Sequence, residues 1–524
     1  MIRPTLDYVV WADGYPPRLQ STVYTGRWLS ITNKFYHMNI IIIGAGIGGL
    51  SAGCLLAKQG HSVTILEKND SVGGKMNEVE SNGFRFDTGP SLFTMPYILD
   101  GLLQECGTSL SKELEMVPLD INCRYFFQDG MQFDNYSDRA QMLREIRRIA
   151  PDDEKSYIKF LEYAESLDKK TRNAFVLNPL HNFSDLKNLN LFSFLGIDAF
   201  TTVSKRIDSY FESPYLQQFF KRFTTYNGSS PYQAPATLNV IPHIELNEGG
   251  YYIKGGLYRV AECLRNLATS LGAVIEYNAK VDRIHVLEGK IKGVETESGE
   301  LLECDLVVTN SDASETILNL IDEFSISAKR KEKQKELEPS CSGFVMLLGI
   351  DKKYEQLIHH NIFFSADYEL EFKQIFEDKV MPDDPTIYIA NTSYTDKDHA
   401  PEDGSNLFVM VNAPYLSESY NWDKNDYGIK IIMELENRGL TELSKHIKYR
   451  SEITPKDFYE KYLSNKGSIY GTSSNDKFSA FLRPRNKSRE IEGLYFTGGS
   501  THPGGGIPLV IQSAVNAVEL INRD

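Results

Sequence analysis

The residues best suited to chemistry in this chain are the small residues of a loop that begins at Gly44. The apolar run Ile40 to Ile43 precedes this loop and predicts a strand buried on both faces of a parallel sheet. Glycines in such a loop allow a tight turn, close approach of a pyrophosphate and close packing of the following helix on the strand. The helix N-terminus adds N–H groups that attract phosphate oxygens. The candidate residues are Gly44, Ala45, Gly46, Gly48 and Gly49.

A carboxylate completes this first unit. The segment Ser62 to Leu66 predicts a second strand, and Glu67 follows it directly. Glu67 stands about 20 residues beyond the glycines, where an acid accepts hydrogen bonds from a ribose. Strand, glycine loop, helix, strand and acid occur in the expected order, so the sequence predicts a dinucleotide-binding site.

A second glycine pair, Gly73-Gly74, follows soon afterwards and is itself followed by the cation Lys75. A nicotinamide enzyme would normally continue into another strand and helix at this point. The additional loop therefore favours a larger cofactor that stays bound, although an ordinary turn is the alternative interpretation of the two glycines.

The C-terminus supplies another strand, glycine loop and helix. Residues 493–497 predict the strand, the loop runs from Gly498 to Pro508, and the apolar spacing beyond it predicts the helix. A helix N-terminus stabilises negative charge. In a flavin site that charge gathers at the N1–C2=O edge when hydride arrives at N5. We expect this loop to face a flavin ring.

Composition excludes several classes of function. A chain of 524 residues can form about two or three domains, and its net charge of −15 argues against a nucleic-acid partner. The six cysteines are scattered and show no metal-ligand spacing. This pattern favours buried thiols in a reducing, cytoplasmic compartment. We expect no metal site.

Several motifs together resemble those of the bacterial phytoene-desaturase-type carotenoid desaturases. The motifs are Phe86 to Ser91, Ser213-Pro214, Asp305 to Asp312 and Gly498 to Pro508. The resemblance covers the chain from Met38 onward. It implies an FAD enzyme, peripheral on a membrane lipid surface, that removes hydride and a proton from a long polyene.

The fold implied by this resemblance is of the α/β class. It has a Rossmann-like FAD-binding domain of the amine oxidase and carotenoid desaturase superfamily, a mixed α+β substrate domain and a helical membrane-associating region. We expect residues 38–120, 250–320 and 481–524 to form the discontinuous FAD-binding domain. Residues 121–249 and 321–480 would bind the substrate. Residues 1–37 are expected to be an extension outside the core.

The resemblance also assigns residues to the cofactor. Glu67 would bind ribose, and Lys75 would lie near the adenosine–pyrophosphate half. Val281 would meet adenine through its backbone, and the Ile507 N–H would face the flavin C2=O. The remaining residues implied at the cofactor are Gly89, Pro90, Ser91, Gly499, Ser500 and Gly506. Amine oxidases carry an acid after the C-terminal glycine, where Gly499 and Ser500 stand here, which weakens the amine oxidase alternative.

The expected reaction follows from the motifs Asp87 to Pro96 and Gly504 to Val510, which look more like those of hydroxycarotenoid 3,4-desaturases. The implied substrate is a 1-hydroxycarotenoid, with oxygen or a quinone as electron acceptor. The alternatives are a phytoene or dehydrosqualene desaturase, a carotenoid isomerase and a lipid escort protein without enzymatic activity. His502 is the candidate acid–base or polar contact, and a histidine that orders the turn is the alternative interpretation.

Two further expectations concern the middle of the chain. Residues 151–226 are predicted to be helical and to contact the membrane, because residues 183–200 are rich in large apolar side chains. Core packing is the alternative for that segment. A hairpin is predicted within Arg124 to Phe133, and further strands at 343–350, 386–391 and 407–412. Strands at 274–277, 281–287 and 291–296 predict a three-stranded antiparallel insert, which precedes a return to the parallel sheet at Leu306.

Overall fold

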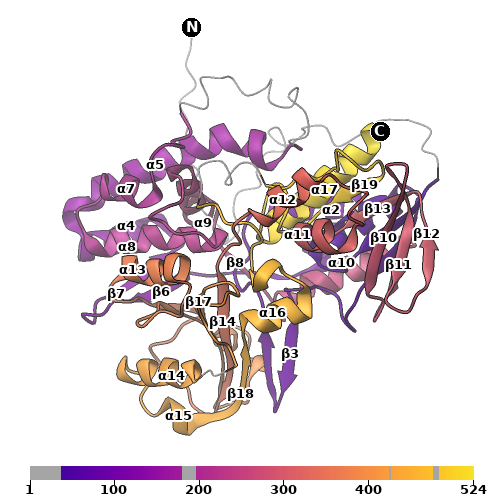
Figure 1. Cartoon of the computed structure of the whole chain (residues 1–524). Coiled ribbons are helices and arrows are strands. Elements are labelled where there is room, and N and C mark those ends of the chain that lie inside the picture. The colour runs from indigo at the N-terminus through magenta and orange to yellow at the C-terminus, as the bar shows by residue number, and fades with distance from the viewer. Residues whose placement is uncertain (1–36, 180–195, 424–425, 476–482) are drawn as a thin grey trace. The chain divides into compact units, whose positions relative to one another are not determined.

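The computed structural model describes residues 37–179, 196–423, 426–475 and 483–524 (Figure 1). The expected N-terminal extension, residues 1–37, lies outside the described residues except for His37. Most of the apolar segment 183–200 also lies outside them. Its described end contains the buried Ile197 and the exposed Phe200.

A five-stranded parallel sheet forms the cofactor side, in the order β19-β13-β1-β2-β9. Alternate residues of the first strand pack into two different apolar clusters. Ile40 and Ile42 belong to one, and Ile41 and Ile43 to the other. The prediction of a strand buried on both faces is therefore confirmed. The strands are β1 (Asn39–Ile43), β2 (Ser62–Leu66), β9 (Val274–Glu276), β13 (Leu306–Thr309) and β19 (Leu494–Phe496).

Helices pack closely on this sheet. The first helix, α1 (Ile47–Lys58), contacts α10 (Tyr258–Ser270) and the C-terminal helix α17 (Ile507–Arg523), which is yellow in Figure 1. Gly53 allows α1 to lie close to strand β2, because a Cβ at this position would lie 2.7 Å from the Ile65 Cδ1 of β2. The other helices on the cofactor side are α2 (Pro96–Glu105), α3 (Leu110–Glu113), α11 (Ala313–Glu315), η6 (Thr316–Leu320) and α12 (Ala328–Lys335).

The predicted three-stranded antiparallel insert is present, but its third strand is one that the sequence did not predict. The insert consists of β10 (Val281–Leu287), β11 (Lys290–Thr296) and β12 (Leu301–Glu303). The predicted strand at Val274 instead pairs in parallel with β2. Strand β12 escaped prediction because it is short and its residues are mostly exposed.

A seven-stranded mixed sheet forms the other side, in the order β18-β14-β17-β16-β15-β6-β7. All nine residues of β14 are buried, since helices and strands cover both of its faces. The predicted hairpin and the three predicted strands in this region are confirmed, whereas β15 and β18 were not predicted. The strands are β6 (Ile121–Phe126), β7 (Gln132–Tyr136), β14 (Ser342–Ile350), β15 (His360–Phe363), β16 (Ile387–Ala390), β17 (Ser405–Ala413) and β18 (Ile447–Ile453).

Residues 139–248 form a group of helices, labelled together at the upper left of Figure 1. The helical prediction for the described part of 151–226 is confirmed. Phenylalanine rings pack these helices together. The rings of Phe211 and Phe220, for example, are stacked with their centres 4.8 Å apart. The elements are α4 (Arg139–Ile149), η1 (Pro151–Asp153), α5 (Glu154–Thr171), η2 (Arg172–Val176), α7 (Val203–Asp208), α8 (Pro214–Lys221), η4 (Arg222–Asn227), η5 (Ala236–Asn239) and α9 (Val240–Glu248).

Short elements complete the described chain. Two short antiparallel pairs are formed by β3 with β4, which are neighbours in sequence, and by β5 with β8, which are not. None of the described helices combines the length and the apolar character needed to cross a membrane. The short elements are β3 (Glu78–Ser81), β4 (Phe84–Asp87), β5 (Met116–Pro118), β8 (Tyr251–Ile253), α13 (Tyr368–Lys373), η7 (Gln374–Asp378), η8 (Thr392–Tyr394), η9 (Lys397–His399), α14 (Tyr427–Asn437), α15 (Leu443–His446), α16 (Pro455–Tyr462) and η10 (Asn465–Gly467).

Candidate functional site

The carboxyl ends of four neighbouring parallel strands meet at one edge of the five-stranded sheet. Strands β1 and β2 lead into Gly44 and Glu67, and strand β13 leads into Asn310. Strand β19 is followed by Thr497 and Gly498. Ligands of open parallel sheets bind in the crevice outside these strand ends. Gly44, Glu67, Asn310 and Gly498 all line one cavity of about 620 Å³.

The first glycine loop leaves no room for larger residues. A Cβ at Gly49 would lie 2.0 Å from the Gly44 carbonyl oxygen, and one at Gly48 would lie 2.5 Å from the Asn310 Oδ1. Gly46 is the N-cap of α1 and offers no side chain to cap it. The N–H groups of the first turn therefore stay available to an anion, as the sequence predicted.

The Glu67 carboxylate holds the first loop in place. It is almost fully buried, and its oxygens accept hydrogen bonds from the Ala45 N–H at 2.8 Å and the Asn69 N–H at 2.9 Å. Each carboxylate oxygen can accept further hydrogen bonds. Glu67 also lines the cavity, and its contact with a ribose stays a prediction.

Lys75 is a half-buried cation on the same wall. Its loop is tied to the first one by the hydrogen bond from the Gly73 N–H to the Ala45 carbonyl oxygen, 2.9 Å long. Its Nζ donates to the carbonyl oxygens of Ser468 and Ile469, both at 3.1 Å. Burial lowers the pKa of Lys75 to about 8. An anionic group in the cavity would favour the charged form of this amine.

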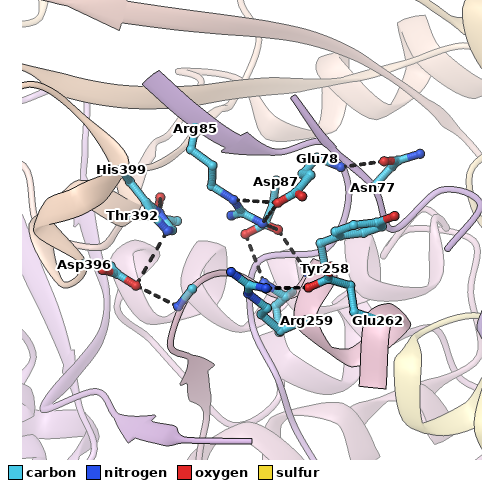
Figure 2. Close-up of polar contacts among 12 residues, drawn as sticks. Asn77, Glu78, Arg85, Asp87, Tyr258, Arg259, Glu262, Thr392, Asp396 and His399 are labelled. Atoms are coloured by element: carbon cyan, nitrogen blue, oxygen red, sulfur yellow. Dashed lines mark hydrogen bonds and ion pairs between the residues drawn. The ribbon is translucent and has the colours of Figure 1, made fainter. Parts of the chain in front are cut away.

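The motif that starts at Phe86 is anchored by the polar network drawn in Figure 2. The Asp87 carboxylate accepts hydrogen bonds from the Leu257 and Tyr258 N–H groups, both at 3.1 Å, at the start of α10. It also pairs with Arg85 at 2.8 Å, and Arg85 pairs in turn with Glu78. Asp87 is therefore a structural anchor. It sets the course of the chain into the cavity-lining loop Gly89 to Ser91.

The C-terminal loop closes the cofactor side of the cavity. The Ser500 Oγ accepts a hydrogen bond from the Ala313 N–H at 2.9 Å, which joins this loop to the segment after β13. Helix α17 begins at Ile507, and its N-cap Gly506 makes no side-chain capping bond. A second uncapped helix N-terminus thus borders the cavity, which Gly506 and Ile507 line.

The opposite wall is built from side chains. Arg222 pairs with Glu245 at 3.0 Å, and Glu245 also accepts hydrogen bonds from the Tyr226 hydroxyl at 2.5 Å and the Asn135 amide at 2.9 Å. The Arg222 guanidinium also lies 4.2 Å from the centre of the Phe223 ring. Much of the remaining wall is apolar and includes Leu238, Ile241, Val345, Ile362, Phe408 and Met410.

A hydrogen-bonded chain connects the two walls. The Ser91 hydroxyl bonds to the Tyr388 hydroxyl, which bonds to the His360 Nδ1 at 2.8 Å. Burial raises the pKa of Tyr388 and lowers the pKa of His360. Both groups are therefore neutral near pH 7. The chain joins a predicted cofactor residue to the side-chain wall without placing a charge there.

His502 does not line the cavity, whereas its neighbour Pro503 does. The His502 ring is buried, and its Nε2 lies 3.0 Å from the Asn178 carbonyl oxygen. Burial lowers the pKa of His502 to about 4, so the ring is neutral near pH 7. A chemical role for His502 stays a prediction. The structure gives the ring a backbone partner between two loops.

The model of the family described as flavin-containing amine oxidoreductase matches residues 47–522. The chain belongs to this family. The 4,4'-diaponeurosporene oxygenase of Staphylococcus haemolyticus (strain JCSC1435) is 37% identical over 487 residues, which cover 92% of this chain and 97% of that protein. The protein of the same name from Staphylococcus aureus (strain MSSA476) is 36% identical over 490 residues, which cover 92% and 98% of the two chains.

Solved structures show the same fold at low sequence identity. An oxidoreductase from Methanosarcina mazei superposes with a TM-score of 0.63 at 15% identity, covering 92% of this chain and 100% of that one. Membership of the flavin-containing amine oxidoreductase family confirms three predictions from the sequence: the fold class, the FAD cofactor and an FAD-dependent oxidoreductase activity. The membrane-associating region within that fold stays a prediction.

The residues present fit FAD. The cavity joins two uncapped helix N-termini, a loop that excludes side chains and a half-buried amine hydrogen-bonded to carbonyl oxygens. The predicted cofactor residues on its wall are Gly44, Gly46, Glu67, Lys75, Gly89, Pro90, Ser91, Val281, Gly499, Ser500, Gly506 and Ile507. Ala45, Gly48 and Gly49 lie behind this wall and shape the loop instead.

Other cavity residues were not predicted as functional from the sequence. Asn310 lies against both the first and the C-terminal glycine loops, since a Cβ at Gly46 would be 2.6 Å from its Nδ2 and one at Gly498 would be 2.9 Å from its Oδ1. Its place directly after a predicted strand of the parallel sheet was the available signal. Arg222 and Arg483 carried no such signal, because helical and irregular segments bring them to the cavity.

A group of three possible metal-ligating side chains, Asp168, His243 and Glu248, lies beside the cavity. Arg172 pairs with both carboxylates, through its Nε to Asp168 at 2.8 Å and through its Nη2 to Glu248. A cation at this place would compete with the guanidinium. We assign the group to an ion-pair network.

Proposed function

We propose that this FAD-dependent oxidoreductase modifies a carotenoid. The observation that carries the proposal is the single cavity that runs from the glycine loops to a largely apolar wall of side chains. A long conjugated hydrocarbon suits such a wall, because apolar surface leaves water on binding. The names of the relatives support the same class of substrate, since both are oxygenases of 4,4'-diaponeurosporene.

The chemistry begins with the loss of hydride from a C–H bond next to the conjugated chain. FAD, when bound, supplies the hydride acceptor. The positive charge left on the substrate spreads along the polyene. Loss of a proton from the neighbouring carbon then forms a new C=C bond, whereas addition of water followed by loss of a proton places oxygen on the carbon. Oxygen or a quinone would take the two electrons from the reduced cofactor afterwards.

The chain's own residues orient the substrate and limit the access of water. The apolar wall keeps bulk water from the substrate cation, which favours proton loss over water addition. Ser91, Tyr388 and His360 form a neutral hydrogen-bonded chain between the two walls. Such a chain can accept a proton at one end without burying a full charge beforehand.

Two finer reactions compete. The motifs support desaturation of the 3,4 bond of a 1-hydroxycarotenoid, whereas the names of the relatives favour introduction of oxygen into the carotenoid. Desaturation of phytoene or dehydrosqualene and isomerisation are the remaining possibilities for the test. An escort protein without enzymatic activity is disfavoured by the fit of the glycine loops to FAD.

Product analysis distinguishes these reactions. The chain would be expressed in cells that make acyclic, monocyclic and hydroxylated carotenoids. The masses of the products would then be measured by mass spectrometry. Desaturation removes two hydrogens, oxygenation adds oxygen, and isomerisation leaves the mass unchanged. Heavy-oxygen water would label the oxygenated product if water is the oxygen source. Purified protein that is not bleached anaerobically by any of these carotenoids would contradict the proposal.

We further propose the division into cofactor and substrate domains at the boundaries expected from the sequence. Strands from the three cofactor segments pair in one parallel sheet, which supports this division.

We also propose that this protein is cytoplasmic and attaches peripherally to a membrane through residues 151–226. The exposed Phe200, with 76% of its surface accessible, and the nearby Lys205 support it. Sedimentation with neutral and anionic vesicles tests the attachment.

A further inference from the structure

Arg483 is a buried cation that pairs with no acidic side chain among the residues that the structure describes. Only 6% of the residue is accessible, and it lines the cavity. Its Nη1 donates to the Tyr470 carbonyl oxygen at 3.1 Å and to the Gly499 carbonyl oxygen at 3.2 Å, and its Nη2 donates to the Asn227 Oδ1 at 2.7 Å. All three acceptors are neutral. Within the described ranges, no carboxylate forms an ion pair with this guanidinium.

The contacts of Arg483 place it against the C-terminal glycine loop. Arg483 donates a hydrogen bond to Gly499 and also packs against Gly504. A Cβ added to Gly504 would lie only 3.1 Å from the Arg483 Nε. This loop leads directly into the uncapped N-terminus of α17. The guanidinium and the helix N-terminus therefore bring positive charge to the same segment of the cavity wall.

Arg222, another arginine of the cavity wall, shows what a buried guanidinium usually requires. Arg222 pairs with the carboxylate of Glu245 at 3.0 Å. Removing a charge from water is costly unless an opposite charge compensates it. Burial lowers the pKa of Arg483 to about 10, which still leaves the group charged near pH 7. None of the described residues supplies its counter-charge, so a negatively charged group that enters the cavity can do so.

We propose that Arg483 is a fixed positive charge that stabilises the reduced flavin. A flavin gains negative charge at its N1–C2=O edge when hydride arrives at N5, and a preorganised cation nearby favours that state. Arg483 thus raises the reduction potential of the cofactor, in addition to the effect of the α17 N-terminus. This inference goes beyond the proposed substrate, because it concerns hydride acceptance from any donor.

The competing explanation is purely structural. Arg483 joins Tyr470, Asn227 and the C-terminal loop, and loss of these hydrogen bonds alone would loosen the site. A structural role predicts lower thermal stability and lower flavin content for a variant. It predicts no change in the potential of the flavin that remains bound.

The experiment measures the midpoint potential of the bound flavin by equilibration with a reference dye. Arg483→Gln removes the charge but can still donate to the Gly499 carbonyl, and Arg483→Lys keeps the charge. Arg438→Met is the matched control, because the Arg438 side chain hydrogen-bonds to the Phe364 and Phe126 carbonyl oxygens and does not line the cavity. All variants are assayed as holoproteins at equal flavin occupancy.

We expect Arg483→Gln to lower the equilibrium constant for reduction of the bound flavin at least tenfold. This change lowers the midpoint potential by about 30 mV for a two-electron couple. Arg483→Lys should retain most of the wild-type potential, and Arg438→Met should retain all of it. A wild-type potential in Arg483→Gln would overturn the proposal. An equal drop in Arg483→Gln and Arg483→Lys would also overturn it, because the charge would then not be the cause.

Discussion

The two walls of the cavity are built by different means. On the cofactor wall, backbone groups dominate: strand ends, glycine loops and two uncapped helix N-termini converge there. On the substrate wall, side chains from helices and from the mixed sheet form the surface. Arg222, Tyr388 and His360 lie there among apolar neighbours. Backbone geometry suits a cofactor whose shape is constant. Side chains supply the apolar surface that a hydrocarbon substrate needs.

The difference extends to how charge is treated. The substrate wall compensates its arginine with Glu245, whereas the cationic side chains of the cofactor wall, Lys75 and Arg483, hydrogen-bond to carbonyl and amide oxygens. The substrate wall should therefore be complete without a ligand. The cofactor wall should gain stability and change its protonation when an anionic group binds.

The largest effect is expected on the substrate wall. Arg222→Met leaves the Glu245 carboxylate buried without its cation, so the free energy of unfolding should fall by about 3–5 kcal/mol. The double variant Arg222→Met/Glu245→Leu removes both charges and should recover much of that loss. Urea denaturation of the holoproteins measures both values. A double variant that is less stable than the single one would contradict the idea of a self-contained ion pair.

The next effect concerns the cofactor wall. Glu67→Ala should lose one or two charge-assisted hydrogen bonds to ribose, each of roughly 1.5–3 kcal/mol. Affinity for FAD should then fall about tenfold to several hundredfold. The variant should still fold, with a modest loss of stability because the Ala45 N–H loses its acceptor. Fluorescence titration of the apoprotein gives the affinity, and Glu67→Asp should lose less.

Full flavin retention by Glu67→Ala after dialysis would mean that this carboxylate only supports the loop. The predicted ribose contact would then be wrong, and the adenosine half of the cofactor would need another assignment.

A smaller, pH-dependent effect is expected at Lys75. Its pKa is about 8 before an anion binds, and cofactor phosphates should raise it. Binding above pH 8 then takes up a proton, so affinity for FAD should fall as pH rises above about 8, by up to tenfold per unit. Below pH 8 the amine is already charged, and affinity should level off. Calorimetry in buffers of different ionisation enthalpy measures the proton uptake.

Lys75→Met provides the control for that experiment. It should bind FAD more weakly below pH 8 and lose the decline above it. An unchanged decline in this variant would assign the proton uptake to another group.

The smallest effect is expected at His502, which lies behind the wall. His502→Gln should retain flavin and lose about 1 kcal/mol of stability, because glutamine only partly replaces the contact with the Asn178 carbonyl. Rates of flavin reduction by a carotenoid and thermal melting measure the two quantities. A large loss of rate at normal flavin content would restore the predicted chemical role.

Prediction from sequence succeeded where local pattern and packing agree. Strand β1 is a run of isoleucines buried on both faces, and the glycine loop after it follows from the same local pattern. Strand β15 was missed because it contains His360 and Asn361, polar residues that rarely lie in a buried strand. The Asn361 side chain is satisfied by the Ile358 and Ile389 carbonyl oxygens, which only the folded chain provides.

The sequence by itself determined the cofactor wall, because glycines, strand ends and helix starts act through backbone geometry within a few residues of one another. Only the tertiary structure decided the substrate wall and the place of the charged groups. Arg222, Tyr388 and Arg483 come from distant segments, and their roles depend on which partners surround them. Burial decides the electrostatics in the same way, since a guanidinium with a carboxylate and one without cannot be distinguished until both are packed.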